Sequence, residues 1–85
     1  MSSYRLILKK SAVKELKSLP KHDTIRISKL LISLRDDPRP RGCKKLKNYN
    51  DLWRIRSGNY RIIYRIEDDK LIVEVLEIVD HKDAY

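Results

Sequence analysis

Apolar residues recur every three or four positions between residues 12 and 34, which is the period of a helix with one buried face. The first run predicts a helix within "AVKELKSL", with Ser11 as its N-cap, and the second follows Pro20, with Asp23 as its N-cap. The apolar positions of the two runs are Ala12, Leu16 and Leu19, then Ile27, Leu30, Leu31 and Leu34. Pro38 ends the second helix, because the residue before a proline avoids helical geometry. The short link between the runs predicts an antiparallel helical hairpin.

The rest of the chain has the alternating pattern of strands. A first strand is expected near residues 3 to 9, and three more at about 51–57, 60–67 and 70–79. The basic segment 41–50 has no period and is predicted to be a loop. Gly58-Asn59 is a strong signal for a two-residue hairpin turn, and Asp68-Asp69 is predicted to turn the next pair of strands.

The two-residue turn at Gly58-Asn59 fixes which residues share a face of the sheet, since opposite residues in an antiparallel pair point the same way. One face then carries Trp53, Ile55, Tyr60, Ile62 and Tyr64, and the other carries Arg54, Arg56, Arg61, Ile63 and Arg65. A turn at Asp68-Asp69 would place Glu74 opposite Ile63 and point Leu71, Val73 and Val75 to the core. It would also point Glu77 there, so a bulge or an early strand end is needed.

These elements predict a single α+β domain spanning residues 1–85: an N-terminal strand, a two-helix antiparallel hairpin and a three-stranded antiparallel meander, with one sheet packed on the helices. A composition of 41% hydrophobic and 38% charged residues is compatible with folding. The N-terminus does not read as a signal peptide, and no run approaches the roughly 20 apolar residues of a membrane span. Cys43 is the single cysteine, so no internal disulfide forms, which fits a reducing cytoplasm and an inert thiol.

The net charge of +8 is concentrated in one stretch of the chain. Residues 39–65 hold nine basic residues and one acid, Asp51, whereas basic and acidic residues balance in the other 58 positions. Such a concentration predicts an anionic partner: a nucleic acid, an acidic protein or an anionic membrane surface.

The arginine face predicts a phosphate site, because arginine forks bind phosphate oxygens and Arg56 directly opposite Arg61 is unfavourable unless neutralised. The alternative is a solvated face partly balanced by Glu74. Tyr49, Tyr60 and Tyr64 are candidates for stacking on bases. The hairpin register, however, favours core packing for Tyr60 and Tyr64.

The chain resembles the RelE/ParE toxin superfamily over essentially its whole length. The residues that carry the resemblance are Lys45-Leu46, Trp53 to Arg56, Gly58 to Tyr64, and His81, Lys82 and Tyr85. The resemblance implies a cytoplasmic toxin of a bacterial or archaeal type II toxin–antitoxin pair, in which RelE-like members cleave mRNA on the ribosome. It implies an acidic antitoxin segment that wraps the toxin in a hetero-oligomer, and mRNA in the ribosomal A site as the substrate.

The chemistry of RNA cleavage needs no protein nucleophile, because the ribose 2′-OH attacks the adjacent phosphate. The enzyme supplies a base, an acid and stabilisation of the phosphorane charge. The expected catalytic residues are Arg56, Arg61, His81, Lys82 and Tyr85. The expected RNA-binding residues are Lys44, Lys45, Lys47, Arg54 and Arg65.

Within the expected catalytic set, Arg56 and Arg61 stabilise the phosphorane, His81 or Lys82 is the basic residue near the C-terminus, and Tyr85 orients the base or phosphate. His22 reads as a surface residue of the helical hairpin. No metal-binding constellation or other cofactor motif is found in the sequence, so metal-independent cleavage is expected. Two alternatives remain open: a ParE-like toxin that poisons DNA gyrase, and a non-catalytic RNA-binding module.

Overall fold

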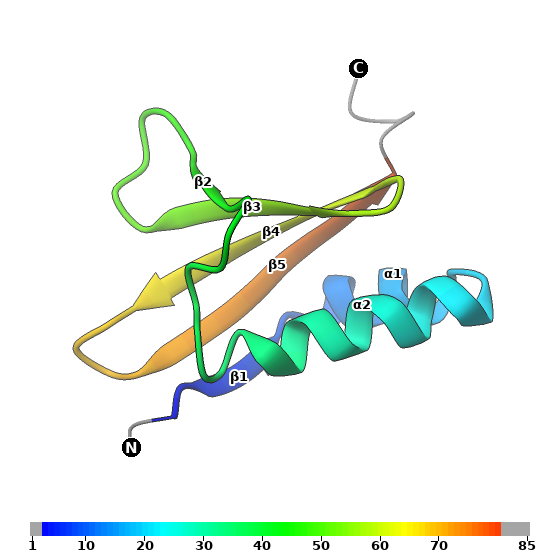
Figure 1. Ribbon diagram of the computed structural model, residues 1–85, viewed down its shortest axis with the longest axis horizontal. Helices are drawn as coiled ribbons and strands as arrows, with labels where there is room; N and C mark the ends of the chain where they lie inside the picture. Colours follow the sequence, from blue (N-terminus) through cyan, green and yellow to red (C-terminus); the bar gives the residue numbers. More distant parts are fainter. Residues whose placement is uncertain (1–2, 81–85) are drawn as a thin grey trace.

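Five strands form one mixed sheet in the order β1-β5-β4-β3-β2, and two helices cover one face of it (Figure 1). The computed structural model describes residues 3–80. The elements in chain order are β1 (Arg5–Leu8), α1 (Lys10–Lys17), α2 (Lys21–Ser33), β2 (Lys44–Lys45), β3 (Leu52–Ser57), β4 (Tyr60–Glu67) and β5 (Ile72–Asp80). The α+β class, the helical hairpin and the antiparallel meander β3-β4-β5 are confirmed. The predicted N-terminal strand is confirmed as β1, which pairs parallel with β5, whereas β2, which pairs antiparallel with β3, was not predicted.

The β3–β4 hairpin has the predicted register. Ser57 pairs with Tyr60 across a two-residue turn in which Gly58 has a φ of 60°, a conformation that favours glycine. Ile55 pairs with Ile62 and lies on the helix side. The separation of apolar and arginine faces is therefore confirmed for this hairpin.

The β4–β5 connection differs from the expected two-residue turn. Glu67 pairs with Ile72, so residues 68–71 form a longer turn that ends with Leu71 at a φ of 54°. Leu71 is exposed rather than in the core, and Glu74 pairs with Arg65 rather than with Ile63.

A bulge resolves the expected conflict at Glu77. The register shifts between Ile63 and Tyr64, which pair with Glu77 and Val75 respectively, so Leu76 is the extra residue. Val75 and Ile78 then both lie in the core, while Glu77 is exposed. The bulge thus keeps the glutamate out of the apolar interior.

Neither predicted N-cap is correct. The N-cap of α1 is Lys9, and Ser11 lies inside the helix, because β1 leads into α1 with only one residue between them. The N-cap of α2 is Pro20, whose carbonyl accepts hydrogen bonds from the amides of Asp23 and Thr24. Asp23 lies within the first turn of α2, where its negative charge stabilises the N-terminus of the helix.

The core lies between the helices and the sheet. Its fully buried members come from both layers and include Ala12, Ile27, Leu34, Ile62, Tyr64, Val73 and Val75. The Tyr64 hydroxyl donates a hydrogen bond to the Pro38 carbonyl at 2.8 Å, which attaches the connection after α2 to the sheet. Burial raises the pKa of Tyr64 far above its usual value, so this hydroxyl keeps its proton.

The basic segment 41–50 is not entirely loop. Lys44 and Lys45 form β2, which pairs with Arg54 and Trp53 of β3. The Leu46 amide donates to the Leu52 carbonyl at 3.0 Å and closes the loop that follows. Two paired residues are too few to produce a period, and this explains why the sequence pattern missed the strand.

Candidate functional site

The sheet face away from the helices gathers basic residues from three strands. Arg56 pairs with Arg61 next to the Gly58-Asn59 turn, and Lys44 pairs with Arg54 two residues further along β3. Two like-charged pairs therefore stand side by side on one face, an arrangement that costs stability and that an anion relieves. The four residues Lys44, Arg54, Arg56 and Arg61 are called the basic corner below.

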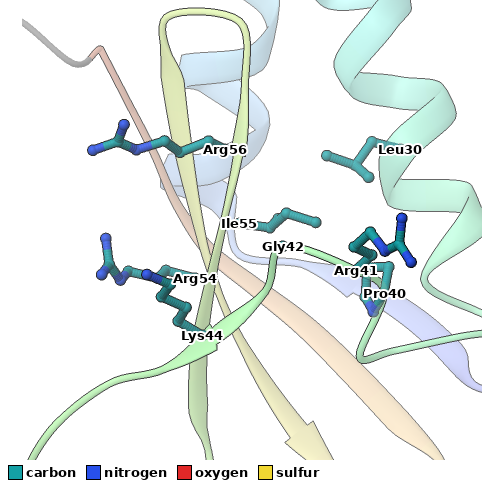
Figure 2. A pocket seen from close by; sticks show the side chains of 8 residues that line it. All are labelled: Leu30, Pro40, Arg41, Gly42, Lys44, Arg54, Ile55 and Arg56. Atoms are coloured by element: carbon teal, nitrogen blue, oxygen red, sulfur yellow. The ribbon is translucent and has the colours of Figure 1, made fainter.

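The side chains of the basic corner share a direction. In Figure 2, Lys44, Arg54 and Arg56 extend to the same side of β3, whereas Arg41 lies on the other side, near Leu30. A hollow of about 520 Å³ at this end of β3 is lined by all four of these basic residues. Arg41 was not among the expected site residues, and its place depends on the turn around Gly42, which has a φ of 94°. The guanidinium groups of Arg54 and Arg56, which extend to the same side of β3 (Figure 2), can together bind a phosphate by multiple charge-assisted hydrogen bonds.

Arg65 forms two ion pairs within the protein. Its Nε lies 3.1 Å from the Asp51 carboxylate, and its Nη1 lies 3.3 Å from the Glu74 carboxylate. Two internal acids therefore balance this guanidinium. The sequence left open the alternative that Glu74 partly balances the charge of the arginine face. For Arg65 this alternative is correct, because the register of β4 and β5 places Glu74 opposite it.

The other two expected RNA-binding lysines are separated from the basic corner. Lys45 pairs with Trp53, which points to the opposite face of β3 from Arg54 and Arg56, so Lys45 belongs to that opposite face. Lys47 is exposed in the loop between β2 and β3. Of the three expected lysines, only Lys44 joins the arginine cluster.

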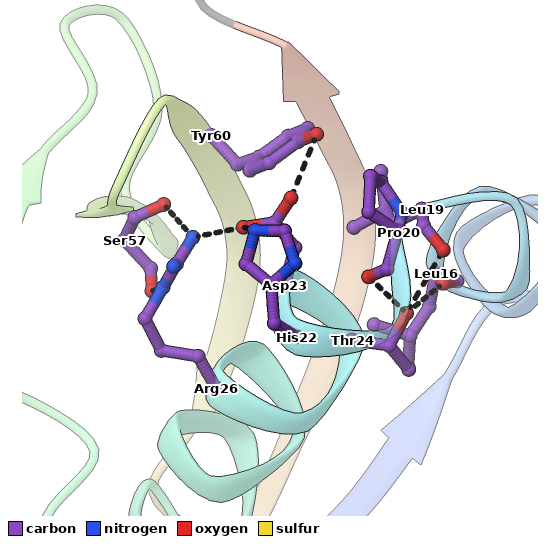
Figure 3. A network of polar contacts seen from close by, with 9 residues as sticks. All are labelled: Leu16, Leu19, Pro20, His22, Asp23, Thr24, Arg26, Ser57 and Tyr60. Carbon is purple, nitrogen blue, oxygen red and sulfur yellow. Dashed lines mark hydrogen bonds and ion pairs between the residues drawn. The ribbon is translucent and has the colours of Figure 1, made fainter.

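A polar network connects the first turn of α2 to the hairpin that carries the basic corner (Figure 3). Arg26 donates through Nε to the Ser57 hydroxyl at 3.1 Å and through Nη2 to the Asp23 carboxylate at 2.8 Å. The Tyr60 hydroxyl donates to the other oxygen of Asp23 at 3.4 Å. Ser57 and Tyr60 flank the turn, so the helix holds both strands of the hairpin.

This network was not predicted from the sequence. Asp23 is only 8% exposed, and its carboxylate is compensated by Arg26 and lies 3.5 Å from the exposed His22. Burial together with the negative charge of Asp23 raises the pKa of Tyr60. The spacing of Asp23 and Arg26 suggests a helix pair, but no local pattern indicates contact with Ser57, which is 31 residues away from Arg26.

A second network anchors the opposite end of the sheet. Arg39 binds both oxygens of Asp68, at 3.2 and 2.7 Å, and stacks 5.0 Å from the centre of the Trp53 ring. The Tyr4 hydroxyl donates to the same carboxylate at 2.7 Å. The hydrogen bond from Arg39 is the main cause, and that from Tyr4 the second, of a pKa of about 2 for Asp68, which is below the usual value for aspartate. Although Arg39 belongs to the basic stretch of the sequence, its charge is used within the protein.

The three tyrosines considered for base stacking have different environments. Tyr64 is fully buried and Tyr60 packs against the core, which confirms the core alternative for both. Tyr49 is 55% exposed, in the loop before β3. It alone of the three remains a candidate for stacking.

The expected residues His81, Lys82 and Tyr85 lie outside the described residues. Asp80, the last described residue, pairs with Tyr60, and Val79 pairs with Arg61. Strand β5 therefore ends beside the basic corner. Within residues 3–80, no group of three or more histidine, cysteine or acidic side chains is placed to hold a metal ion. Neither helix in that range is long and apolar enough to cross a membrane.

The fold and the basic corner define a small α+β protein with a basic sheet face, and comparison with known proteins identifies its family. The family model of the ParE toxin of type II toxin–antitoxin systems matches residues 6–85, and the chain belongs to this RelE/ParE superfamily. It is similar to Toxin RelE3 of Methanocaldococcus jannaschii, with 39% identity over 88 residues, covering 95% of this chain and 94% of the relative. It is a RelE-family toxin of a toxin–antitoxin system.

Solved structures agree with this assignment. The RelE–RelB complex of the archaeon Pyrococcus horikoshii matches with a TM-score of 0.84 and 32% identity, covering 93% of this chain and 96% of that chain. The intact E. coli RelBE toxin–antitoxin complex matches with a TM-score of 0.79 and 29% identity, covering 92% and 96%. The predicted family is therefore confirmed.

Proposed function

We propose that this toxin is a metal-independent endoribonuclease that cleaves mRNA in the ribosomal A site and thereby inhibits translation. The observation that carries the proposal is the basic corner, in which Lys44, Arg54, Arg56 and Arg61 share one outward face. RNA is a suitable ligand because its phosphates accept several guanidinium contacts at once, and because it brings its own nucleophile. The RelE names of the similar proteins support the same reading.

The proposed reaction is attack of the ribose 2′-OH on the adjacent phosphorus, with loss of the 5′-oxygen of the next nucleotide. Arg56 and Arg61 stabilise the charge that develops on the phosphorane oxygens. His81 or Lys82, which follow directly on Asp80 in sequence, carry protons, and Tyr85 orients the base or the phosphate. Lys44 and Arg54 hold the neighbouring RNA backbone. Arg65 contributes less than first expected, because Asp51 and Glu74 already balance it.

The proposed protein partner is a cognate antitoxin with an acidic segment that covers the basic corner and wraps the helical hairpin. Both crystal structures above are complexes of a RelE toxin with its antitoxin. Helix α2 also exposes Ile25 and Ile32, which are 47% and 58% exposed and lie two turns apart on one side of the helix. This apolar pair lies in the helix layer, on the opposite side of the sheet from the basic corner (Figure 1), so the antitoxin needs one part to cover the helix and another to neutralise the arginines.

A second candidate is poisoning of DNA gyrase, which the ParE description of the matching family model favours. One experiment separates the two and also tests a non-catalytic RNA-binding module. Purified protein is added to translating ribosomes and the 5′ ends of mRNA are mapped, while a parallel gyrase assay scores DNA breaks. New ends within the A site are the expected result. DNA breaks without new RNA ends would replace the proposal with the gyrase reading, and ribosome binding without either would favour the module.

The arginine requirement is tested in cells. Wild-type toxin expressed without antitoxin is expected to arrest growth, whereas Arg61→Ala is expected to be tolerated. Lys29→Ala, which removes an exposed charge from α2, is the matched control and is expected to remain toxic. If wild type and Arg61→Ala are equally harmless, toxicity through this site is wrong.

A further inference from the structure

A second hollow, of about 350 Å³, lies on the arginine face of the sheet and has a different chemistry. Its lining includes Leu52, Ile63 and Leu76 from three neighbouring strands, with the exposed ring of Tyr49 beside them. Lys9 and Glu77 supply one donor and one acceptor to the same hollow. Apolar side chains together with an aromatic ring and a few polar groups are what a flat, partly apolar ligand requires.

The bulge in β5 builds one wall of this hollow. Because Leu76 is the extra residue of the bulge, Val75 faces the core while both Leu76 and Glu77 are available to the outer face. A regular strand would alternate and would send one of the two inward. The irregularity that keeps Glu77 out of the core therefore also supplies apolar lining on the outside.

The hollow adjoins the basic corner. Ile63 lies two residues from Arg61 along β4, and its cross-strand partner on β3 is Arg54. Residues two apart on a strand are about 7 Å apart, and cross-strand partners are about 5 Å apart. One arginine therefore lies directly opposite Ile63, and another lies two positions from Ile63 on the same strand. Arginines that can bind a phosphate, placed beside an apolar hollow that can hold a base, match the phosphate and the base of a nucleotide.

We propose that this hollow binds one nucleobase of the RNA, with the phosphate of the same nucleotide bound by Arg54 and Arg61. The proposal rests on the proposed function and specifies how the site holds its substrate. Tyr49 stacks on the base, Ile63 and Leu76 contact it through apolar surface, and Lys9 and Glu77 face its polar edge. Aromatic stacking on single-stranded RNA changes the affinity for a base by about five-fold or more, so Tyr49 is a binding residue with a measurable effect.

The direct test is titration of the isotope-labelled chain with nucleoside 5′-monophosphates, followed by NMR. Adenosine, guanosine, cytidine and uridine monophosphates are compared with ribose 5-phosphate, which carries the phosphate without a base. The methyl groups of Ile63 and Leu76 are expected to shift with at least one nucleotide and not with ribose 5-phosphate. Equal shifts with ribose 5-phosphate, or no shifts at these methyls with any nucleotide, would overturn the proposal.

Variants of Tyr49 provide a second measurement that does not disturb the fold, because this side chain is largely exposed. Tyr49→Ala is expected to weaken nucleotide binding about five-fold or more, and Tyr49→Trp to retain it. Binding of ribose 5-phosphate is expected to be the same in both variants. A Tyr49→Ala protein that binds the nucleotides as tightly as wild type would overturn the role of stacking.

The ribosome experiment distinguishes failure of this inference from failure of the proposed function. Suppose that wild type cleaves mRNA and that Tyr49→Ala cleaves it at the same rate and at the same bases. The proposed base binding in the hollow is then wrong, and the proposed nuclease activity is retained. If nucleotides shift the hollow but wild type cleaves no RNA, base binding stands and the nuclease is wrong. A changed rate or base preference in Tyr49→Ala supports both.

Discussion

Arg26 of helix α2 donates a hydrogen bond to the hydroxyl of Ser57 at 3.1 Å, across 31 residues of sequence. Ser57 is the last residue of β3 and pairs with Tyr60, so this contact fixes the turn next to the Arg56–Arg61 pair. Two guanidinium groups directly opposite each other tend to open the end of a hairpin. The contact from the helix opposes that tendency, and it leads to the first prediction.

Replacing Arg26 by alanine is expected to lower the free energy of unfolding by about 1–3 kcal/mol, because it leaves the largely buried Asp23 carboxylate without its closest cation. Urea unfolding followed by circular dichroism measures the loss. Amide exchange at Tyr60, which pairs with Ser57 across the turn, is expected to accelerate as the turn loosens. Lys29→Ala on the same helix is the control and should change neither quantity; an Arg26→Ala protein as stable as that control would contradict the prediction.

Gly58→Ala is expected to destabilise the protein more than Gly42→Ala. Both glycines have positive φ, but a Cβ at Gly58 would collide with the Arg26 guanidinium, whereas a Cβ at Gly42 meets no atom within 4 Å. The strain of positive φ is common to both and costs about 1 kcal/mol. Thermal or urea unfolding of the two variants gives the comparison. Equal losses would mean that Arg26 moves away without cost, and a smaller additional loss in the Arg26→Ala background would verify the collision.

Stability at acid pH is expected to depend on Asp68. Its folded pKa of about 2 lies below the usual value of about 3.9 for aspartate, so its pairing stabilises the fold above pH 4. That contribution is lost as the pH falls from about 4 towards 2. NMR titration of the Asp68 carboxyl is expected to give a higher pKa in Arg39→Ala than in wild type, because Arg39 is the main cause of the shift. Lys70→Ala is the control. It removes an ion-pair partner of Glu67 and should leave the NMR titration curve of the Asp68 carboxyl unchanged.

Tyr64→Phe is expected to cost about 1–2 kcal/mol of unfolding free energy, because it removes the hydrogen bond to the buried Pro38 and leaves that carbonyl without its donor. Chemical denaturation gives the value. Tyr49→Phe removes the same hydroxyl from an exposed ring and should have no effect. Similar losses in both variants would show that the hydroxyl of Tyr64 does not matter to the fold.

Binding of RNA by the basic corner is expected to be steeply salt-dependent. Arg54→Ala and Arg56→Ala should each weaken binding and reduce the slope of log K against log salt by about one, since each removes one phosphate contact. Arg65→Ala should reduce the slope less, because Asp51 and Glu74 already hold that guanidinium. Fluorescence anisotropy with a single-stranded RNA at several salt concentrations measures the slopes. Equal slopes for all three variants would contradict a phosphate role specific to the corner.

The sequence by itself determined the helical hairpin, the β3–β4 register and the arginine face. These features depend on local rules: the helical period of Ile27 and Leu31, the alternation of β3 and β4, and a glycine that accepts positive φ at position 58. The family resemblance used the same hairpin residues. All of these can be read from neighbours in the chain.

Only the tertiary structure decided the rest. The parallel pairing of β1 with β5, the bulge at Leu76 and the contact of Arg26 with Ser57 join residues that are far apart in sequence or depend on which side chains find room in the core. The same is true of Arg65, which carries the same charge as Arg54 but is balanced because the register of β5 brings Glu74 to it. Charge is a property of a residue, whereas neutralisation and access depend on what the fold places beside it.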